Sequence, residues 1–161
     1  MDNYTLFYYK FLSANPTDEN FFSSTINTPL WSSWSGLAFE RVCLEHIKQI
    51  KIALQIGGVK TEVCSFYTTR DENDGIYGSQ IDLLIVRNDS TINLCEMKFS
   101  NKPYLVTNKD IEKMNIRISD LLKISKTRYA IIPTLIVSPD ALNNSNSNEF
   151  NSIISSDSLF N

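Results

Sequence analysis

The chain has 161 residues, of which 42% are hydrophobic and 20% are charged, and its formal net charge at pH 7 is −3. The length suits a single domain with one core, and the composition excludes the disordered class of proteins. Residues 4–12 are apolar and aromatic, but Tyr8, Tyr9 and Lys10 interrupt them and they are too short to cross a bilayer. We therefore expect no membrane partner and a cytoplasmic location.

The first 30 residues are predicted to form a helical extension and a linker, with a short helix near residues 3–12 and a Ser-, Thr- and Asn-rich stretch after it. Residues 31–161 are predicted to form the main domain. The extension is rich in large apolar side chains, which suggests self-association or docking on a partner protein. These side chains are Leu6, Phe7, Tyr8, Phe11, Phe21 and Phe22. Folding back onto the domain is the alternative.

A long helix is predicted over residues 33–55, because Leu37, Leu44, Ile47 and Leu54 recur at helical spacing. The Gly57-Gly58 pair then supplies a stop signal. A strand is predicted over residues 59–67, followed by a polar loop.

Two further strands are predicted over residues 79–87 and 91–99, joined by a tight turn at residues 88–90. A helix over residues 107–125 and a fourth strand over residues 129–137 follow, with a short closing element near the end of the chain. The order helix, three strands, helix, strand (αβββαβ) predicts an α/β fold, with a central mixed four-stranded sheet flanked by helices.

Cys43, Cys64 and Cys95 are odd in number and lack the spacing of zinc ligands. Free cysteine is among the most frequently buried residue types. We therefore expect three reduced thiols in the core.

Charge is divided unevenly along the chain. Between residues 98 and 128, eight basic and three acidic side chains give +5, which leaves −8 for the remainder. Phosphate contacts dominate affinity for nucleic acids, so this stretch is a candidate DNA interface. Its proposed phosphate-binding residues are Lys102, Lys109, Lys113 and Arg117. A solvated helix face with ordinary i,i+4 pairing is the alternative reading of the same residues.

The predicted hairpin gathers polar residues at its open end. If its turn has three residues, Asp82 lies opposite Glu96 and Gln80 lies opposite Lys98, on a face that is otherwise apolar. Two carboxylates at this spacing repel each other and lose hydration, so they need a cation. An oxygen-rich site of this kind suits Mg²⁺ or Mn²⁺.

The preceding helix adds a further acid. Leu37, Glu40, Leu44 and Ile47 follow the spacing of one helix face, and Glu40 is the acid on that stripe. Because an acid on a buried stripe needs a partner, Glu40 is a candidate fourth member of the site. A position at the margin of the stripe, with the carboxylate in water, is the alternative.

Sequence motifs now connect these residues to a family. QIDLLI at residues 80–85 and CEMK at residues 95–98 resemble motifs II and III of the PD-(D/E)XK nuclease superfamily. A closer resemblance is to the nuclease-like domain at the C-terminus of certain bacterial and archaeal P-loop ATPases. It rests on WSSWSGLAFE at residues 31–40, INLCEMKFS at residues 92–100 and the closing LF, and it spans about residues 4–160.

The resemblance implies a restriction-endonuclease-like core and a role for each site residue. Asp82 and Glu96 would hold Mg²⁺ or Mn²⁺ with the backbone carbonyl of Met97, and Glu40 would ligate directly or through water. Lys98 would orient the attacking water and offset charge in the transition state.

The expected function is therefore that of a Mg²⁺- or Mn²⁺-dependent phosphodiesterase that cleaves DNA as an endonuclease, with Gln80 orienting a ligand of the metal. The alternative is a catalytically silent DNA-binding or regulatory module that partners an ATPase, in which the acids form a structural cluster. No glycine-rich phosphate loop precedes Met1 in the sequence, so we expect a stand-alone version or a fragment, and ATP binding is not implied.

Overall fold

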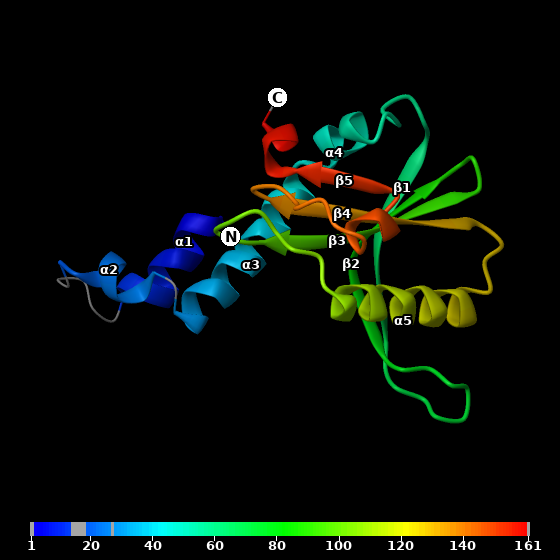
Figure 1. Ribbon diagram of the computed structural model, residues 1–161, viewed down its shortest axis with the longest axis horizontal. Coiled ribbons are helices and arrows are strands. Elements are labelled where there is room, and N and C mark those ends of the chain that lie inside the picture. The colour runs from blue at the N-terminus through cyan, green and yellow to red at the C-terminus, as the bar shows by residue number, and fades with distance from the viewer. Residues whose placement is uncertain (1, 14–18, 27, 161) are drawn as a thin grey trace. The chain divides into compact units, whose positions relative to one another are not determined.

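The computed structural model describes residues 2–13, 19–26 and 28–160 (Figure 1). The chain divides into two compact units, Met1–Ala38 and Phe39–Asn161. Helix α3, Pro29–Glu45, contains both this boundary and the division predicted at residue 30. Among the described residues, no helix combines the length and the apolar character needed to cross a membrane.

The first unit is helical. It contains α1 (Asn3–Phe7), a π-helical turn over Tyr8–Leu12, α2 (Phe21–Thr25) and the first turns of α3. Asp2 caps α1, because its carboxylate accepts a hydrogen bond of 2.9 Å from the backbone N–H of Thr5. Residues 14–18 of the predicted linker lie outside the described residues.

Aromatic rings pack against one another within this unit. The ring centroids of Phe7 and Trp34 are 5.2 Å apart, and those of Phe11 and Trp31 are 5.9 Å apart. Phe11 is buried, whereas Tyr8 is 43% exposed. Much of the apolar surface counted as available for a partner is therefore used inside the unit. Self-association through this segment stays a prediction, and the side chain of Phe22 lies outside the described residues.

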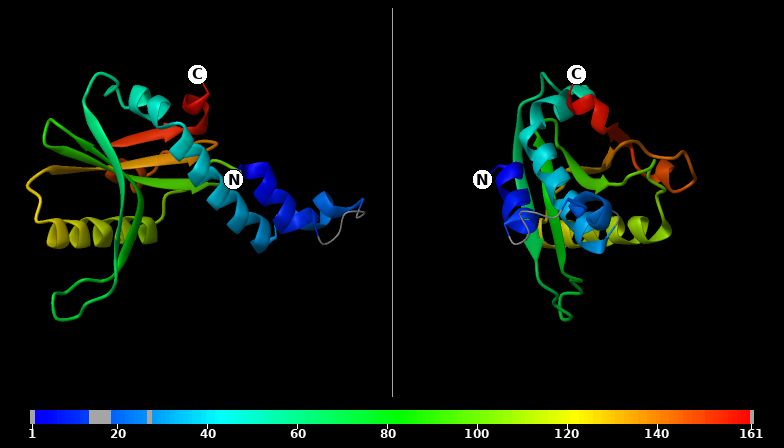
Figure 2. Two further views of the ribbon diagram at one scale, coloured as in Figure 1. Left: turned by 180° about the vertical axis from the view of Figure 1, so that it is seen from behind. Right: turned by 90° about the vertical axis from the view of Figure 1, so that its left-hand side faces the viewer.

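The second unit is built on a five-stranded mixed sheet with the strand order β1-β2-β3-β4-β5 (Figures 1 and 2). Strands β1 to β3 are antiparallel, and β3, β4 and β5 are parallel. The strand bounds are β1 Thr61–Thr68, β2 Ser79–Arg87, β3 Thr91–Phe99, β4 Ala130–Ser138 and β5 Ser152–Ser155. The α/β class and the mixed sheet are confirmed, but the prediction of four strands is wrong. The closing element is a short strand, and four residues are too few for a clear alternating pattern.

Helices cover both faces of this sheet (Figure 2). Helix α5, Asn108–Ser125, connects the parallel strands β3 and β4, which cannot be joined by a tight turn. Its side chains Met114 and Leu121 pack on Leu94 and neighbouring residues of one face. The other face packs against the end of α3 and against α4, Ile47–Ala53, through Phe39 and Ile50.

Strands β2 and β3 have the predicted bounds and the predicted turn. Arg87 pairs with Thr91 and Leu84 pairs with Leu94. Ser90 in the turn has a φ of 61°, the left-handed conformation that tight hairpin turns require. The alternation of apolar residues and a short polar turn were sufficient to predict this part of the fold.

The predicted helix over residues 33–55 is two helices, because α3 ends at Glu45 and α4 begins after His46. The predicted buried stripe is also wrong, since Leu37 and Leu44 are 58% and 43% exposed. The buried residues of α3 are instead Ser35, Phe39 and Cys43.

Strand β2 is irregular where it carries Asp82. In the pairing with β1, Ser65 opposes two residues of β2, Asp82 and Leu83, which is the arrangement of a β-bulge. The packing agrees with this, because Ile81 and Leu84 belong to the α5-facing cluster whereas Leu83 belongs to the opposite one. Strict alternation of faces therefore stops at Asp82.

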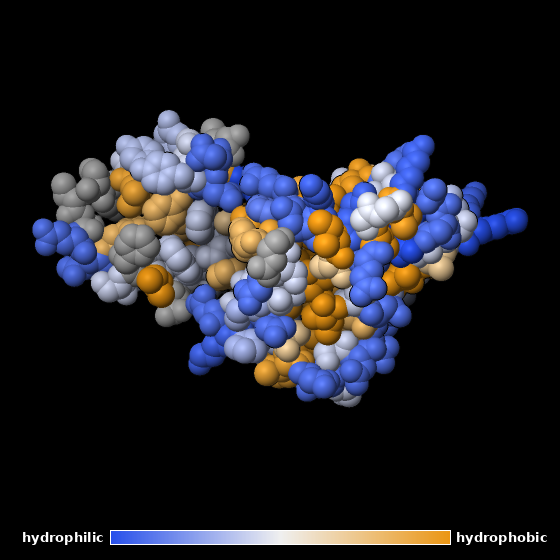
Figure 3. Space-filling view, turned by 90° about the horizontal axis from the view of Figure 1, so that it is seen from above, coloured by the Kyte–Doolittle hydropathy of each residue, from blue (hydrophilic) through white to orange (hydrophobic). Residues whose placement is uncertain are grey.

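Apolar side chains also reach the surface. In the space-filling view of Figure 3, orange apolar residues lie among blue hydrophilic ones over the face seen from above. Exposed apolar residues of the second unit include Ile52, Ile153 and Phe160. Some exposed apolar surface is ordinary on folded proteins.

Cys43 and Cys95 are free and buried, as expected, but Cys64 on β1 is exposed and not a core thiol. Burial raises the pKa of both Cys43 and Cys95 to about 12. Native protein should therefore react with one equivalent of a thiol reagent at pH 8, and denatured protein with three. The serine variant of Cys64 should abolish the native reaction, and rapid labelling of a second thiol would contradict this packing.

Candidate active site

Glu96 and Lys98 lie on the face of β3 that points to α5. Ile92 and Leu94 belong to the core cluster on that face, and residues two apart in a strand share a face. Met97, on the opposite face, packs its side chain in the other cluster. The sequence therefore places the carboxylate of Glu96 and the ammonium group of Lys98 on the same face, at the end of an apolar strand.

Both carboxylate oxygens of Glu96 are engaged by cations. Lys98 Nζ lies 2.7 Å from Oε1 of Glu96, and Nη1 of Arg117 on α5 pairs with Oε2. The three side chains are 14% to 25% exposed, so these ion pairs are largely removed from water. A carboxylate in such a place is tolerated because it is paired.

Lys98 also faces a second acid. Its Nζ is 3.9 Å from Oδ1 of Asp110 in the first turn of α5. Asp110 accepts hydrogen bonds of 2.9 Å from the hydroxyl of Tyr104 and of 2.7 Å from the hydroxyl of Thr107. Burial acts to raise the pKa of Asp110, but the hydrogen bonds from Thr107 and Tyr104 outweigh it and lower that pKa. Asp110 and Tyr104 were absent from the predicted site.

The hydrogen bond to Asp110 also holds Tyr104 in place. Burial, and then the hydrogen bond to Asp110, raise the pKa of the Tyr104 hydroxyl well above its usual value of 10. The hydroxyl therefore keeps its proton and acts as a donor. Its effect is to fix the carboxylate that lies beside Lys98.

Asp82 reaches the site from β2, but not in the way predicted. The pairing of β2 with β3 follows the predicted register from Arg87 and Thr91 to Leu83 and Cys95 and ends there, so the predicted pairs of Asp82 with Glu96 and of Gln80 with Lys98 are not formed as strand pairs. The bulge in the pairing of β2 with β1, at Asp82 and Leu83, lies where the pairing with β3 ends. Gln80 instead donates a hydrogen bond of 2.7 Å from Nε2 to Oδ1 of Asp82 on its own strand.

Glu40, near the end of α3, is electrostatically coupled to the strand residues. Burial raises the pKa of Glu40 most, followed by the negative charges of Asp82 and then Glu96. The positive charges of Lys98 and Arg117 act in the opposite direction. Of the four residues predicted as catalytic, Glu96 and Lys98 are therefore in direct contact, and Glu40 interacts electrostatically with both and with Asp82.

The donors fit a hard divalent cation in kind, since carboxylate oxygens are the ligands that Mg²⁺ and Mn²⁺ prefer. The positions of these side chains, however, do not form a complete set of metal ligands. Within the described ranges, no three acidic, histidine or cysteine side chains are arranged to hold a metal ion. The contacts of Glu96 provide a reason, because Lys98 and Arg117 occupy both of its oxygens.

The four basic residues predicted to bind DNA differ in their exposure to solvent. Lys102, Lys109 and Lys113 are exposed, as a phosphate-binding surface requires. Arg117 instead points into the site and pairs with Glu96. The helical spacing could have indicated this inward position, because Arg117 lies three residues after the buried Met114 and four before the buried Leu121.

A further acid, Asp120, was also missed. It is fully buried, and its carboxylate accepts hydrogen bonds of 3.0 Å from the backbone N–H of Tyr77 and of 2.6 Å from the hydroxyl of Ser79. Lys123 adds a hydrogen bond of 2.5 Å to the carbonyl of Gly75. Helix α5 therefore holds the loop before β2, and with it the start of the strand that carries Asp82.

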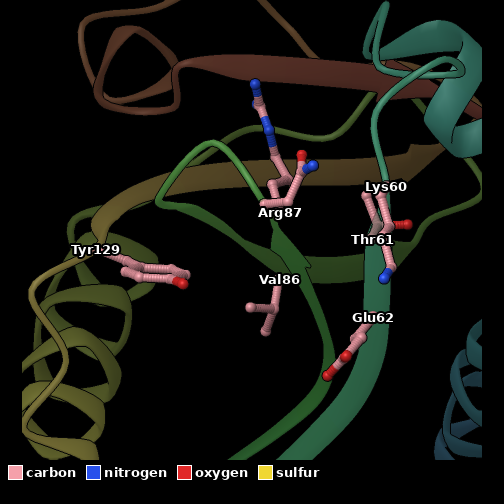
Figure 4. Close-up of a pocket in the computed structure, with 7 residues that line it drawn as sticks. Lys60, Thr61, Glu62, Val86, Arg87 and Tyr129 are labelled. Atoms are coloured by element: carbon pink, nitrogen blue, oxygen red, sulfur yellow. The ribbon is translucent and has the colours of Figure 1, made fainter.

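A shallow pocket lies at the other end of β2, beside the hairpin turn (Figure 4). Figure 4 shows Val86 and Arg87 projecting in different directions, with Tyr129 beside Val86. Arg87 lies five residues along the strand from Asp82, a separation of roughly 17 Å in an extended chain. This pocket is therefore separate from the carboxylate site.

No protein-family model matches the chain, and no curated protein matches it. Among solved structures, the chain is similar to the crystal structure of a protein of unknown function, AF1548. The TM-score is 0.44 at 17% identity, and the match covers 66% of this chain and 51% of the other. The matched part thus spans about half the length of that protein.

The raised pKa of Glu40 predicts a pH-dependent effect on stability. Because the folded state favours the protonated carboxyl, stability is lost as the pH rises through this raised pKa. Glu40→Gln cannot ionise, so it should be more stable than the wild type at pH 8, by less than about 1 kcal/mol after solvent screening. The advantage should vanish below the ordinary value of 4.5.

Urea unfolding at pH 4 and pH 8 would measure this difference. Glu45→Gln removes an exposed acid from the same helix and serves as the matched control. Equal pH responses of the two variants would contradict the coupling of Glu40 to Asp82 and Glu96.

Proposed function

We propose that this chain is a Mg²⁺- or Mn²⁺-dependent phosphodiesterase that cleaves DNA, on a restriction-endonuclease-like core of the PD-(D/E)XK type. One observation carries the proposal. Asp82 and Glu96 both act to raise the pKa of Glu40, so three carboxylates share one neighbourhood beside Lys98.

Without a bound cation, such a cluster of carboxylates lowers the stability of the folded state. Like charges in a partly buried place repel one another, and each acid also loses hydration. Functional sites are where arrangements of this kind concentrate, because a ligand or a reaction uses the stored electrostatic energy. A divalent cation is the ligand that removes the conflict among three carboxylates.

Each residue then has a definite role. Asp82, Glu96 and Glu40 would hold the metal, with the Met97 carbonyl as a further oxygen donor. When bound, the metal lowers the pKa of a water molecule and polarises the phosphoryl group. Lys98 donates hydrogen bonds that orient the attacking water and offset the negative charge of the transition state. Gln80 fixes the orientation of Asp82 through its 2.7 Å hydrogen bond.

DNA is the proposed substrate because of the charge near the site. Helix α5 follows β3 and presents Lys109 and Lys113 to solvent, and Lys102 is exposed between the two elements. A polyanion bound there would lie on the side of the sheet to which Glu96 and Lys98 point.

A second function is favoured by a different observation. Glu96 is already neutralised by Lys98 and Arg117, and among the described residues no acidic group is arranged as a metal cage. This supports a catalytically silent DNA-binding or regulatory module, with an ATPase as its proposed partner. The two functions differ in turnover.

The test is Mn²⁺-dependent nicking of supercoiled DNA by the intact chain. Asp82→Asn should lower divalent-ion affinity and abolish cleavage, and it should leave the metal-free fold at least as stable because carboxylate repulsion falls. Lys98→Ala should keep the metal but slow turnover by a factor on the order of 10².

Metal titration and melting temperature on the same samples separate loss of chemistry from loss of fold. If the wild type binds Mn²⁺ and DNA but cleaves no faster than Lys98→Ala on DNA and RNA substrates, the enzyme proposal fails. The binding module then takes its place.

The exposed lysines give a separate prediction. Replacing Lys109 and Lys113 together by glutamine should weaken DNA binding and reduce the slope of log K against log salt by about 2, since each phosphate contact contributes about 0.9. Titrations at several salt concentrations would measure the slope. An unchanged slope would remove these two residues from the interface.

A further inference from the structure

Arg117 is placed unlike the other basic residues of α5. Its side chain is 22% exposed, and it belongs to the side of the helix that carries the buried Met114 and Leu121. The only carboxylate paired with it across the described part of the chain is Glu96. A guanidinium held in this way acts on the site and not on the general surface of the helix.

We propose that Arg117 is an exchangeable counter-ion: it holds Glu96 until a divalent cation binds, and it then contacts the phosphodiester of bound DNA. This inference rests on the proposed function, because it takes Glu96 as a metal ligand. It adds a substrate-contacting residue that the predicted catalytic set of Glu40, Asp82, Glu96 and Lys98 does not contain.

The first step follows from competition for one carboxylate. Arg117 occupies Oε2 of Glu96, and Lys98 lies 2.7 Å from Oε1. A divalent cation on this carboxylate needs at least one of the two oxygens, and it repels the cation already there. Each oxygen has two lone pairs, so the metal does not displace a donor by occupancy alone, but the repulsion between the metal and the cations already there favours the opening of one of the two contacts.

The second step identifies which contact opens. Lys98 has another carboxylate close by, since its Nζ is 3.9 Å from Oδ1 of Asp110, and Tyr104 and Thr107 hold that acid in place. Lys98 thus keeps a partner whichever oxygen of Glu96 the metal takes. Arg117 has no second ion pair among the described residues, and Glu40, the other acid on which its charge acts, would itself take part in holding the metal.

The third step concerns the released guanidinium. A partly desolvated cation is costly without an anion, and the planar fork of arginine matches the oxygens of a phosphate in a bidentate fashion. The phosphodiester that Lys98 and the metal would act on is such an anion, and Arg117 shares Glu96 with Lys98. Arg117 should therefore contribute to DNA binding only when the metal is present.

The first experiment titrates Mn²⁺ into the metal-free full-length chain by calorimetry. Arg117→Gln should bind Mn²⁺ about tenfold more tightly than the wild type, and Arg117→Lys should fall between the two because it keeps the charge but loses the fork. Lys113→Gln removes the same charge one turn away and should change the affinity by less than about twofold. Equal or weaker Mn²⁺ binding by a folded Arg117→Gln would overturn the proposal.

The second experiment measures affinity for a short DNA duplex with Ca²⁺, which supplies the divalent charge while cleavage is slow, and without a divalent ion. Arg117→Gln should lose about tenfold in affinity with Ca²⁺ and little without it, whereas Lys113→Gln should lose affinity in both conditions. An equal loss for Arg117→Gln in both conditions would identify it as an ordinary phosphate contact and overturn the exchange.

The two proposals fail in different ways. If the wild type and Arg117→Gln both bind no Mn²⁺, the metal-dependent function and the exchange fall together. If both bind Mn²⁺ with equal affinity, the exchange fails while the proposed function stands. Circular dichroism and melting of each variant confirm that the fold is retained, and Arg117→Lys preserves the test if Arg117→Gln does not fold.

Discussion

The contact of Glu96 with two cations is the interaction on which the site depends. Glu96 is 14% exposed at the end of a buried strand, and Lys98 and Arg117 together satisfy both of its oxygens. Lys98 comes from the same strand, but Arg117 comes from α5, so the pair also fixes the helix against the sheet. Removing one partner from such a group leaves a charge without compensation, which costs several times what an exposed ion pair contributes.

Sequence reasoning succeeded where the pattern is local. Alternation and a polar turn predicted the bounds of β2 and β3, and helical spacing predicted α5 to within one residue at its start. It failed where apolar spacing carries no signal. His46 separates α3 from α4, and its Nδ1 lies 2.7 Å from the carbonyl of Val42, a local side-chain contact that periodicity does not report. The fifth strand was missed because four residues packed on β4 carry too short a pattern.

The candidate site shows the same division. The residue types that suggest chemistry were visible in the sequence, and the coupling of Glu40 to Asp82 and Glu96 agrees with their being grouped. The geometry was not visible, since counting gave the register of β2 with β3 but neither the bulge of β2 against β1 nor the end of the hairpin pairing at Leu83. Arg117 was assigned to the surface by charge alone, although its place on the buried side of α5 sends it into the site. A basic side chain in the sequence suggests affinity for an anionic partner, whereas its burial in the fold decides which anion it can contact.

The irregularity in β2 has a second consequence, for solubility. An open sheet exposes unpaired backbone groups along its edge strands, and these can add strands from other molecules. In this unit β5 is only four residues long, and the long edge strand β1 pairs with β2 across the bulge, where Ser65 opposes two residues of β2. A short edge strand is a poor template for strand addition, and a bulge in the neighbouring strand increases the local twist, which makes the long edge less flat. The bulge at Asp82 therefore also acts against edge-to-edge aggregation of the sheet.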